Sequence, residues 1–298
     1  MTSLLLLLLP SLLFLAGVFA LPLVRYLWLS FHADSVMTGL VAIPNDAANW
    51  QRFFQDLRFW QDLGQTLRFA LASVTLELLV GFAIALMLNQ PLRGRALIRT
   101  TALIPWALPT TVMALGWRWI FNTPYGPVNR LFESTFGQSL NALGEPSLAW
   151  ITTVYADVWK TTPFVALILL AGLQTIPADL YEAARLEGAG VWTCLKRITL
   201  PLLLPYLGLA LMFRLAQAFG VFDLIQVMTG GGPASSTESI ALYAYWNALR
   251  FLDFGYSATI MIGSFIILTT MVAIAWMVIT TARRRTACLL YTSPSPRD

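Results

Sequence analysis

Long uncharged apolar runs restrict the fold of this sequence more than any other feature. The first run extends from Leu4 to Val24, and Arg25 is the first charged residue of the chain. A helix needs about 20 apolar residues to cross the roughly 30 Å hydrocarbon core of a bilayer. The run lacks the basic region of a secretory signal peptide and is longer than its usual apolar part. We therefore expect a first transmembrane helix over residues 4–30.

The composition excludes several other classes of protein. The 298 residues are 57% hydrophobic and 11% charged, whereas an average soluble domain is about 25% charged. The net charge of +4 is spread thinly and forms no basic face of the kind that binds nucleic acid. Disorder requires low hydrophobicity and high charge, so it is excluded as well. The main solvent of this chain is therefore expected to be lipid.

Further apolar runs follow the first, and together they predict an all-α integral membrane protein with six transmembrane helices. The six expected spans are residues 4–30, 63–88, 100–121, 148–175, 205–228 and 256–280. Pro105 and Pro109 interrupt the third span. Residues 122–147 are rich in Gly and Pro and predict a loop. Residues 239–254 have apolar side chains at helical spacing, which predicts an amphipathic helix at the outer interface.

Lys and Arg residues in the loops predict the orientation, because cytoplasmic loops carry the excess of positive charge. Nine of them lie on the side that holds loops 89–99 and 176–199 and the C-terminal end, and four lie on the other side. We therefore expect the first side, with both termini, to be cytoplasmic. Residues 288–298 resemble the translation of a sequencing adapter, so we expect this tail to be non-native and exclude it from fold reasoning.

The chain offers little material for catalysis or metal binding. It has one histidine, His32, and two cysteines, Cys194 and Cys288, whereas a zinc site needs about four ligands at close spacing. It has no glycine-rich phosphate-binding loop that ends in Lys-Ser or Lys-Thr. We expect no catalytic residue, no metal, no bound cofactor and no ATP hydrolysis by this chain itself.

The most informative motif lies in the loop between the fourth and fifth spans, residues 176–199. Pro177 and Asp179 favour the start of a helix, and Leu180, Ala183 and Ala184 give it a compact apolar side. Gly188 and Gly190 then break this helix, and a second short helix is expected to lead to Pro201. The predicted structure is a pair of short helices joined by a glycine turn on the cytoplasmic face. Its small residues allow close docking into a groove of a partner protein.

This loop resembles the EAA loop in permease subunits of binding-protein-dependent ABC importers. Glu182-Ala183-Ala184, Gly188-Ala189 and Ile198-Thr199-Leu200-Pro201 keep the spacing of that motif. A second segment, Leu224–Pro233 followed by Thr237, is similar to the end of the fifth span in sugar permeases of the maltose and glycerol-3-phosphate type. Together the resemblance covers nearly all of residues 4–285.

The resemblance implies a type I importer permease fold in a bacterial inner membrane. It also implies three partners. The first is a second permease subunit, expected to be a paralogue. The others are an ABC ATPase dimer that holds ATP and Mg²⁺ and an extracytoplasmic solute-binding protein. The carried-over roles fall on Glu182, Ala183, Ala184 and Gly188, which would form the coupling helix and turn that insert into an ATPase subunit. Exchange between two rigid packed arrangements would then move the spans.

Polar residues inside lipid usually face a bundle interior or a cavity, and they define the candidate pore. Polar or small residues recur at every third position of the fifth span, beside Phe219 and Phe222: Arg214, Gln217, Gly220, Asp223 and Gln226. Amides and carboxylates beside aromatic rings suit the hydroxyls and the apolar ring face of a sugar. The alternative is that Arg214 and Asp223 serve contacts between helices.

Other charged and aromatic residues within the spans have structural interpretations. Asp157 and Lys160 are three residues apart and are expected to pair with each other. Glu77 has no local partner and should pair with another helix. Trp117 and Trp119 form either an interfacial belt or a platform for a sugar.

Two other classes of function remain open at this point. An ion- or proton-coupled secondary transporter would explain six spans and buried charges but leaves the EAA-type loop unexplained. An intramembrane enzyme would need a nucleophile–base pair or a metal cluster, and this sequence offers neither. The favoured substrate is a neutral di- or oligosaccharide or a glycosylated osmolyte, because a phosphorylated substrate would need more positive charge than Arg214 supplies.

Overall fold

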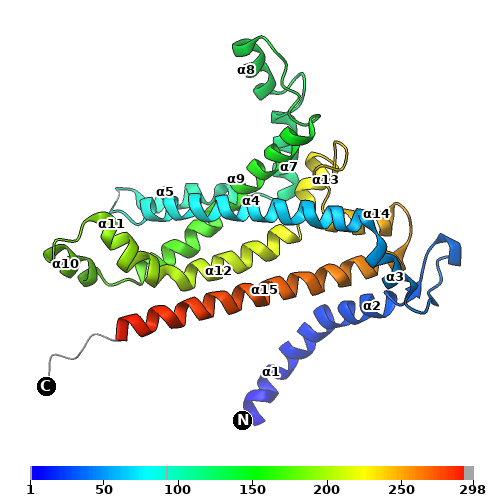
Figure 1. Cartoon of the computed structure of the whole chain (residues 1–298), viewed down its shortest axis with the longest axis horizontal. Helices are drawn as coiled ribbons and strands as arrows, with labels where there is room; N and C mark the ends of the chain where they lie inside the picture. Colours follow the sequence, from blue (N-terminus) through cyan, green and yellow to red (C-terminus); the bar gives the residue numbers. More distant parts are fainter. Residues whose placement is uncertain (1, 92, 292–298) are drawn as a thin grey trace. The chain divides into compact units, whose positions relative to one another are not determined.

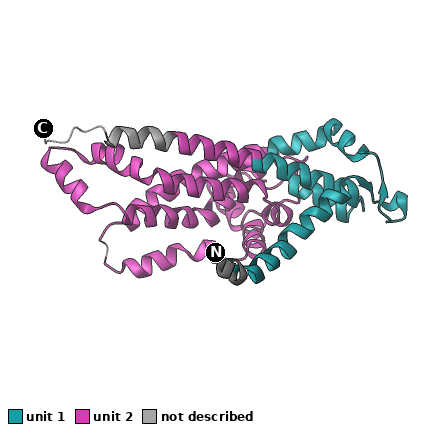
Figure 2. Cartoon of the chain, turned by 90° about the horizontal axis from the view of Figure 1, so that it is seen from below, with its two compact units in different colours: residues 1–65, 238–269 teal, residues 66–237, 270–298 magenta. Residues whose placement is uncertain are grey.

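The computed structural model describes residues 2–91 and 93–291, which are mostly helical. Within these residues, five helical segments are long and apolar enough to cross a membrane: Leu8–Leu29, Leu57–Leu88, Pro146–Gln174, Val191–Phe219 and Phe254–Thr281. The chain forms two compact units (Figure 2). The first unit contains the N-terminal 65 residues and residues 238–269, and the second contains residues 66–237 and the chain after residue 269.

The first unit begins with a continuous apolar helical run. Its elements, labelled in part in Figure 1, are α1 (Thr2–Leu15), the π-helical turn η1 (Ala16–Ala20), α2 (Leu21–Leu29), β1 (His32–Ala33), the 3₁₀ turn η2 (Val36–Thr38), β2 (Ile43–Pro44), α3 (Ala48–Gln55), the start of α4 (Leu57–Leu88), α14 (Ile240–Leu249) and the start of α15 (Phe254–Tyr291). The antiparallel strands β1 and β2 pair His32 with Pro44 and Ala33 with Ile43. No part of the apolar window in Leu8–Leu29 is buried within this chain, as suits a surface made for lipid or another subunit.

Asp56 joins three helices of the first unit. Its carboxylate accepts hydrogen bonds from the hydroxyls of Tyr243, at 2.7 Å, and Tyr256. It also accepts from the backbone N–H groups of Arg58, at 3.0 Å, and Phe59, at 3.3 Å. Burial, followed by the neighbouring Asp56, raises the pKa of Tyr243 to about 12, so this hydroxyl remains a donor. Asp56 and Tyr243, which are 187 positions apart in sequence, are thus held together.

Ion pairs also hold the helical ends of the first unit together. Arg58 Nη2 lies 2.8 Å from a carboxylate oxygen of Glu238, whose side chain is fully buried. Arg52 Nη1 lies 2.8 Å from Asp253 Oδ2, and its guanidinium stacks over the Tyr256 ring at 3.6 Å. The predicted helix over residues 239–254 is present as the shorter α14.

The second unit is a bundle of long helices with shorter ones at its ends. It contains the rest of α4 and α15, α5 (Arg95–Ala102), α6 (Ile104–Ala107), α7 (Thr110–Ile120), α8 (Pro127–Phe136), α9 (Pro146–Gln174), α10 (Ala178–Leu186), α11 (Val191–Cys194), the π-helical turn η3 (Leu195–Thr199), α12 (Leu200–Phe219) and α13 (Asp223–Met228). Helix α8 lies within the segment that was expected to be a loop, residues 122–147.

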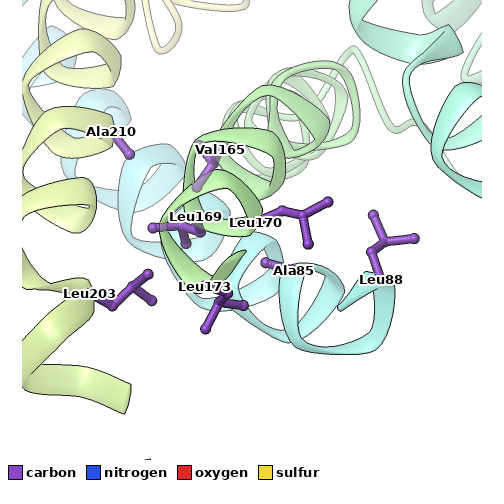
Figure 3. Close-up of a cluster of buried hydrophobic side chains, with 8 residues drawn as sticks. All are labelled: Ala85, Leu88, Val165, Leu169, Leu170, Leu173, Leu203 and Ala210. Atoms are coloured by element: carbon purple, nitrogen blue, oxygen red, sulfur yellow. The ribbon is translucent and has the colours of Figure 1, made fainter. Parts of the chain in front are cut away.

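Helices α4, α9 and α12 pack around one buried apolar cluster (Figure 3). The cluster consists of Ala85, Leu88, Val165, Leu169, Leu170, Leu173, Leu203 and Ala210. Lipid tails are as apolar as leucine, so close packing rather than transfer from water favours such contacts in a membrane. A small residue permits the approach of α4 to α9, because a Cβ added at Gly81 would lie 2.8 Å from Val165 Cγ1.

The expected third span, residues 100–121, differs from the prediction because it is not one helix. The chain forms α5, α6 and α7 in succession. Pro109 lacks a backbone N–H and disfavours helical geometry in the residue before it, and Leu108 is accordingly extended at φ −69° and ψ 136°. Among the described residues, the third span is therefore missing from the single helices long enough to cross a membrane.

The segment of the expected fifth span, residues 205–228, is likewise not one helix. A continuous helical segment starts at Val191, passes through Pro201 and Pro205 and ends at Phe219. The π-helical turn η3 directly before α12 changes the backbone hydrogen-bond pattern, which lets the helix accommodate a proline near its start. Gly220, Val221 and Phe222 then separate α12 from α13.

The last long helix, α15, continues to Tyr291, ten residues or more past the expected end of the sixth span near residue 280. Residues 288–291 of the tail that was expected to be non-native lie in this helix, and residues 292–298 lie outside the described residues.

Candidate functional site

Three charged residues meet in the interior of the second unit, one from each of α4, α9 and α12. Arg214 donates through Nε and Nη2 to the carboxylate of Glu77, with 2.8 Å for the second bond, and through Nη2 to Asp157 Oδ2 at 3.0 Å. The Arg214 side chain is 2% exposed. Buried charges are costly unless they are paired and hydrogen-bonded, so this network fixes the relative positions of three helices.

Neutral side chains complete the network. Thr161 Oγ1 donates to Glu77 Oε1 at 2.7 Å, and Arg214 Nη1 donates to Gln217 Oε1 at 2.7 Å. The expectation that Glu77 pairs with another helix is confirmed. The expected pair of Asp157 with Lys160 is wrong, because the ion pair of Asp157 is with Arg214.

Lys160 binds instead to the broken third segment. Its Nζ donates to the carbonyl oxygens of Leu108, at 2.8 Å, and Trp106, at 3.3 Å. The chain leaves helical geometry at Leu108, so these carbonyls lack helical donors in lipid. The ammonium of Lys160 donates hydrogen bonds to these carbonyls. Lys160 therefore has partners other than Asp157, the acidic residue three positions before it.

A cavity of about 280 Å³ opens beside this network. Its polar lining comes from α7, α9, α12 and α13: Thr110, Asp157, Lys160, Thr161, Arg214, Gln217 and Asp223. Trp106 and Phe222 add aromatic surface. Polar and charged side chains form most of the lining, and converging polar groups fix the orientation of a small molecule in its site. Carboxylates and an amide oxygen accept hydrogen bonds from hydroxyls, and the aromatic rings can cover an apolar face.

The predicted pore residues divide into two groups. Arg214, Gln217, Gly220 and Asp223 line the cavity. Phe219 is buried and does not line it, and neither does Gln226, whose buried Oε1 has no hydrogen-bond partner in the described structure. The stripe at every third residue assumed one continuous helix, and the break after Phe219 places Asp223 and Gln226 on α13 instead.

Some lining residues carried no sequence signal for a site. Thr161 and Trp106 are common residue types in apolar helices, and only the fold brings them beside α12. Asp157 and Lys160 were noticeable as charges inside an apolar segment, but their partners Arg214 and Leu108 lie 57 and 52 residues away. Trp117, which was considered for an interfacial belt or a sugar platform, contacts Phe121, Tyr155 and Trp159 in an aromatic cluster. Among the described residues, no group of three His, Cys, Asp or Glu side chains is arranged to hold a metal.

The EAA-type segment forms two helices joined by a glycine turn at one end of the second unit (Figure 1). Helix α10 carries Glu182, Ala183 and Ala184, and the first two are exposed. It ends with Ala189 N–H donating to the Ala184 carbonyl at 2.9 Å, and Gly188 has φ +82°. This is the left-handed geometry that favours glycine after a helix. The second helix is not short, since α11 continues through η3 into α12.

The loop presents apolar side chains to its surroundings. Leu186 is 91% exposed and Val191 is 88% exposed. The hydroxyl of Tyr181 lies 3.0 Å from Thr199 Oγ1 and ties α10 to η3.

A bundle of long apolar helices with a polar cavity in its interior and a protruding two-helix loop is the architecture of a membrane transport component. The chain belongs to the family of binding-protein-dependent transport system inner membrane components, whose model matches residues 77–286. This family membership identifies the chain as a permease subunit of an ABC importer and as an inner membrane component. It supports neither an ion-coupled carrier nor an enzyme.

Two characterised relatives illustrate the similarity. The chain is 41% identical over 266 residues to the trehalose/maltose transport system permease protein MalF of Thermococcus litoralis, covering 88% of each chain. It is 36% identical over 276 residues to the sulfoquinovosyl glycerol transport system permease protein SmoG of Agrobacterium fabrum, covering 93% of this chain and 90% of the relative.

The fold is shared with solved transporters. A chain in the crystal structure of a bacterial ABC transporter involved in the import of the acidic polysaccharide alginate matches with a TM-score of 0.76 and 21% identity. The match covers 98% of this chain and 96% of that one. The similarity therefore extends over both units.

Proposed function

We propose that this permease forms half of the pore for a neutral di- or oligosaccharide, or for a glycosylated osmolyte, and that the cavity beside Arg214 is where the substrate makes contact. The observation that carries this proposal is the cavity lining of carboxylates, an amide and aromatic rings. The names of the MalF and SmoG relatives, which refer to trehalose/maltose and to sulfoquinovosyl glycerol, support the sugar class. Since sulfoquinovosyl glycerol carries a sulfonate, the preference for a neutral substrate rests on the charge of the site.

The charge balance of the site favours a neutral substrate. The cavity and its network contain three carboxylates, from Glu77, Asp157 and Asp223, and two cations, from Lys160 and Arg214. Arg214 already serves two of the carboxylates. A substrate that carries a phosphate or a carboxylate would thus enter a site of net negative charge, and repulsion between like charges would oppose its binding.

Variants of two lining residues test the substrate site. We expect Asp223→Asn and Gln217→Ala each to raise the KM for sugar uptake by about five- to tenfold, because each removes one hydrogen bond of about 1 kcal/mol or more. Uptake is measured in proteoliposomes that contain the complete transporter and its binding protein. Gln226→Ala is the matched control, since Gln226 lies on the same helix as Asp223 and does not line the cavity. Equal effects in all three variants would contradict the assignment.

For the two-helix loop we propose the role of coupling to an ABC ATPase. Glu182 and Ala183 on α10 would enter a groove of the ATPase, with Ala184 packed behind them, and Gly188 would shape the turn. ATP and Mg²⁺ would bind to the ATPase dimer and not to this chain. A second permease subunit, expected to be a paralogue, would supply the other half of the pore, and an extracytoplasmic binding protein would deliver the sugar. The exposed apolar side chains of Leu186 and Val191 support a protein partner at this surface.

We propose six membrane crossings, with α5, α6 and α7 together making the broken third one. Both termini would then lie in the cytoplasm, in agreement with the arginine-rich loops. Single cysteines introduced at residue 94 and at residue 137 should be labelled by a membrane-impermeant thiol reagent from opposite sides. Labelling of both from the same side would exclude this topology.

A further inference from the structure

The first unit has a small cavity that the transport mechanism does not use. Its volume is about 260 Å³. Arg25, Tyr26 and Leu29 line it from α2, and Asp34 lines it from the segment after β1. The rest of the lining comes from the end of α14 and the start of α15, including Phe254 and Ser257.

Two opposite charges line this cavity without neutralising each other. Among the described residues Arg25 forms neither a hydrogen bond nor an ion pair, and its side chain is exposed. Asp34 Oδ1 is buried and has no hydrogen-bond partner. The position of Asp34 is fixed by its backbone, because its carbonyl accepts from Phe254 N–H at 2.8 Å and Gly255 N–H at 3.2 Å. A buried, unpaired carboxylate oxygen is costly unless a ligand satisfies it.

The surroundings of the cavity are those of a membrane interface. Arg25 is the single charged residue of the apolar segment Leu8–Leu29 and lies near its end. Tyr26, Trp28 and Phe31 are each 44–48% exposed around this end. Exposed aromatic residues at the end of an apolar helix lie at the level of lipid headgroups.

We infer that this cavity binds the headgroup of a zwitterionic phospholipid with a primary amine, that is, a phosphatidylethanolamine. The guanidinium of Arg25 binds the phosphate, for which its planar donors are well matched. The carboxylate of Asp34, which lines the cavity, accepts a hydrogen bond from the ammonium. Phosphatidylcholine has no N–H group that could donate to Asp34. Phosphatidylglycerol has a net negative charge, and its headgroup has no cation that could face Asp34.

Native mass spectrometry of the full chain, purified in detergent and titrated with single lipids, tests this inference. We expect wild type to retain phosphatidylethanolamine at least about tenfold more than phosphatidylglycerol or phosphatidylcholine, since one charge-assisted hydrogen bond is worth about that factor. Arg25→Gln should remove the binding of phosphatidylethanolamine. Asp34→Asn should abolish the preference over phosphatidylglycerol while retaining the phosphate contact.

Arg250→Gln is the matched control, because Arg250 belongs to the same unit, stacks on Trp246 and lies outside the cavity. Thermal unfolding of each variant shows that it is folded before its lipid binding is compared. Equal retention of the three lipids by wild type, or unchanged phosphatidylethanolamine binding in Arg25→Gln, would overturn the inference. Displacement of the lipid by equimolar soluble phosphoethanolamine would assign the cavity to the free compound and would also overturn it.

Discussion

Arg214 is the residue on which the interior of the second unit depends most. It forms ion pairs with Glu77 on α4 and Asp157 on α9, and it is almost completely buried. The two carboxylates accept from the same guanidinium, so loss of the cation leaves both without their main partner. Loss of one carboxylate leaves the other pair intact. This asymmetry makes the network testable with single substitutions.

We expect Arg214→Gln to lower the free energy of unfolding by about 3–5 kcal/mol, the usual result when one member of a buried ion pair is removed. Glu77→Gln should be less destabilising, because the pair of Arg214 with Asp157 remains. Thermal unfolding in detergent, followed by tryptophan fluorescence, ranks the two variants. A Glu77→Gln variant that is less stable than Arg214→Gln would contradict this description of the network.

Asp56 predicts a specific pH dependence in the first unit. Burial alone would raise the pKa of its carboxyl, but the hydrogen bonds from Tyr256 and Tyr243 and from the N–H groups of Phe59 and Arg58 lower it below 3.8 overall. A carboxyl whose pKa is lower in the folded than in the unfolded state stabilises the fold above its unfolded pKa of about 3.9. This contribution is lost as the pH falls through the lower folded value.

Asp56→Asn should therefore be less stable than wild type at pH 7, and the difference should shrink as the pH is lowered from about 4. Melting temperatures measured at closely spaced pH values between 7 and 3 give this comparison. A difference that stays constant over the whole range would show that ionisation of Asp56 does not contribute.

Among the elements, α4 shows how the packing of a helix depends on where its glycines lie. Gly81 faces Val165 on α9 at a distance that leaves no space for a side chain, whereas a Cβ added at Gly64 in the same helix meets no atom within 4 Å. One glycine therefore permits a helix contact, and the other only adds backbone freedom.

Gly81→Ala should destabilise the protein by about 1–3 kcal/mol through overpacking against Val165. Gly64→Ala should stabilise it by about 0.5–1 kcal/mol, because alanine is the better helix former. Both effects are measured by thermal unfolding of the purified chain. If the two substitutions shift the melting temperature in the same direction, the close contact of α4 with α9 is wrong.

The elements also show what could be predicted from sequence. Helices such as α4 and α9 were predictable because their apolar runs have the length of a membrane crossing and their ends carry turn residues. The course of the chain near prolines could not be predicted from the sequence. Pro109 breaks the third segment, while Pro201 and Pro205 are accommodated within the segment that runs from Val191 to Phe219. Hydrogen-bond partners elsewhere in the fold decide between these outcomes, as the contacts of Lys160 with the carbonyls before Pro109 illustrate.

The candidate site was predictable only in part for a similar reason. Polar residues on α12 were visible as exceptions in an apolar helix, and four of the six predicted pore residues line the cavity. Their partners on α4 and α9 depend on tertiary packing. The EAA-type motif was more informative, because the turn at Gly188 depends on residues that are close in sequence.

At the scale of the whole molecule, the chain is one permease subunit with two regions to which we assign a role. The cavity beside Arg214 lies among α9, α12 and α13, and the loop of α10 and α11 leads directly through η3 into α12. A displacement of the loop therefore acts on the helix that carries Arg214 and Gln217. In our account, ATP-driven movement of a partner ATPase reaches the substrate site by this covalent route, as a rigid-element shift.

ATP-dependent sugar uptake by the complete transporter, compared between Gly188→Trp and Gly190→Ala, tests this account most directly. Gly188 has φ +82° and Gly190 has φ −75°, and neither has atoms within 4 Å of an added Cβ. A side chain at Gly188 is strained by about 1–3 kcal/mol and should distort the turn. We predict that Gly188→Trp inserts into the membrane but neither retains the ATPase on purification nor supports uptake, while Gly190→Ala does both. Normal uptake and ATPase binding by Gly188→Trp would contradict the coupling role of the loop.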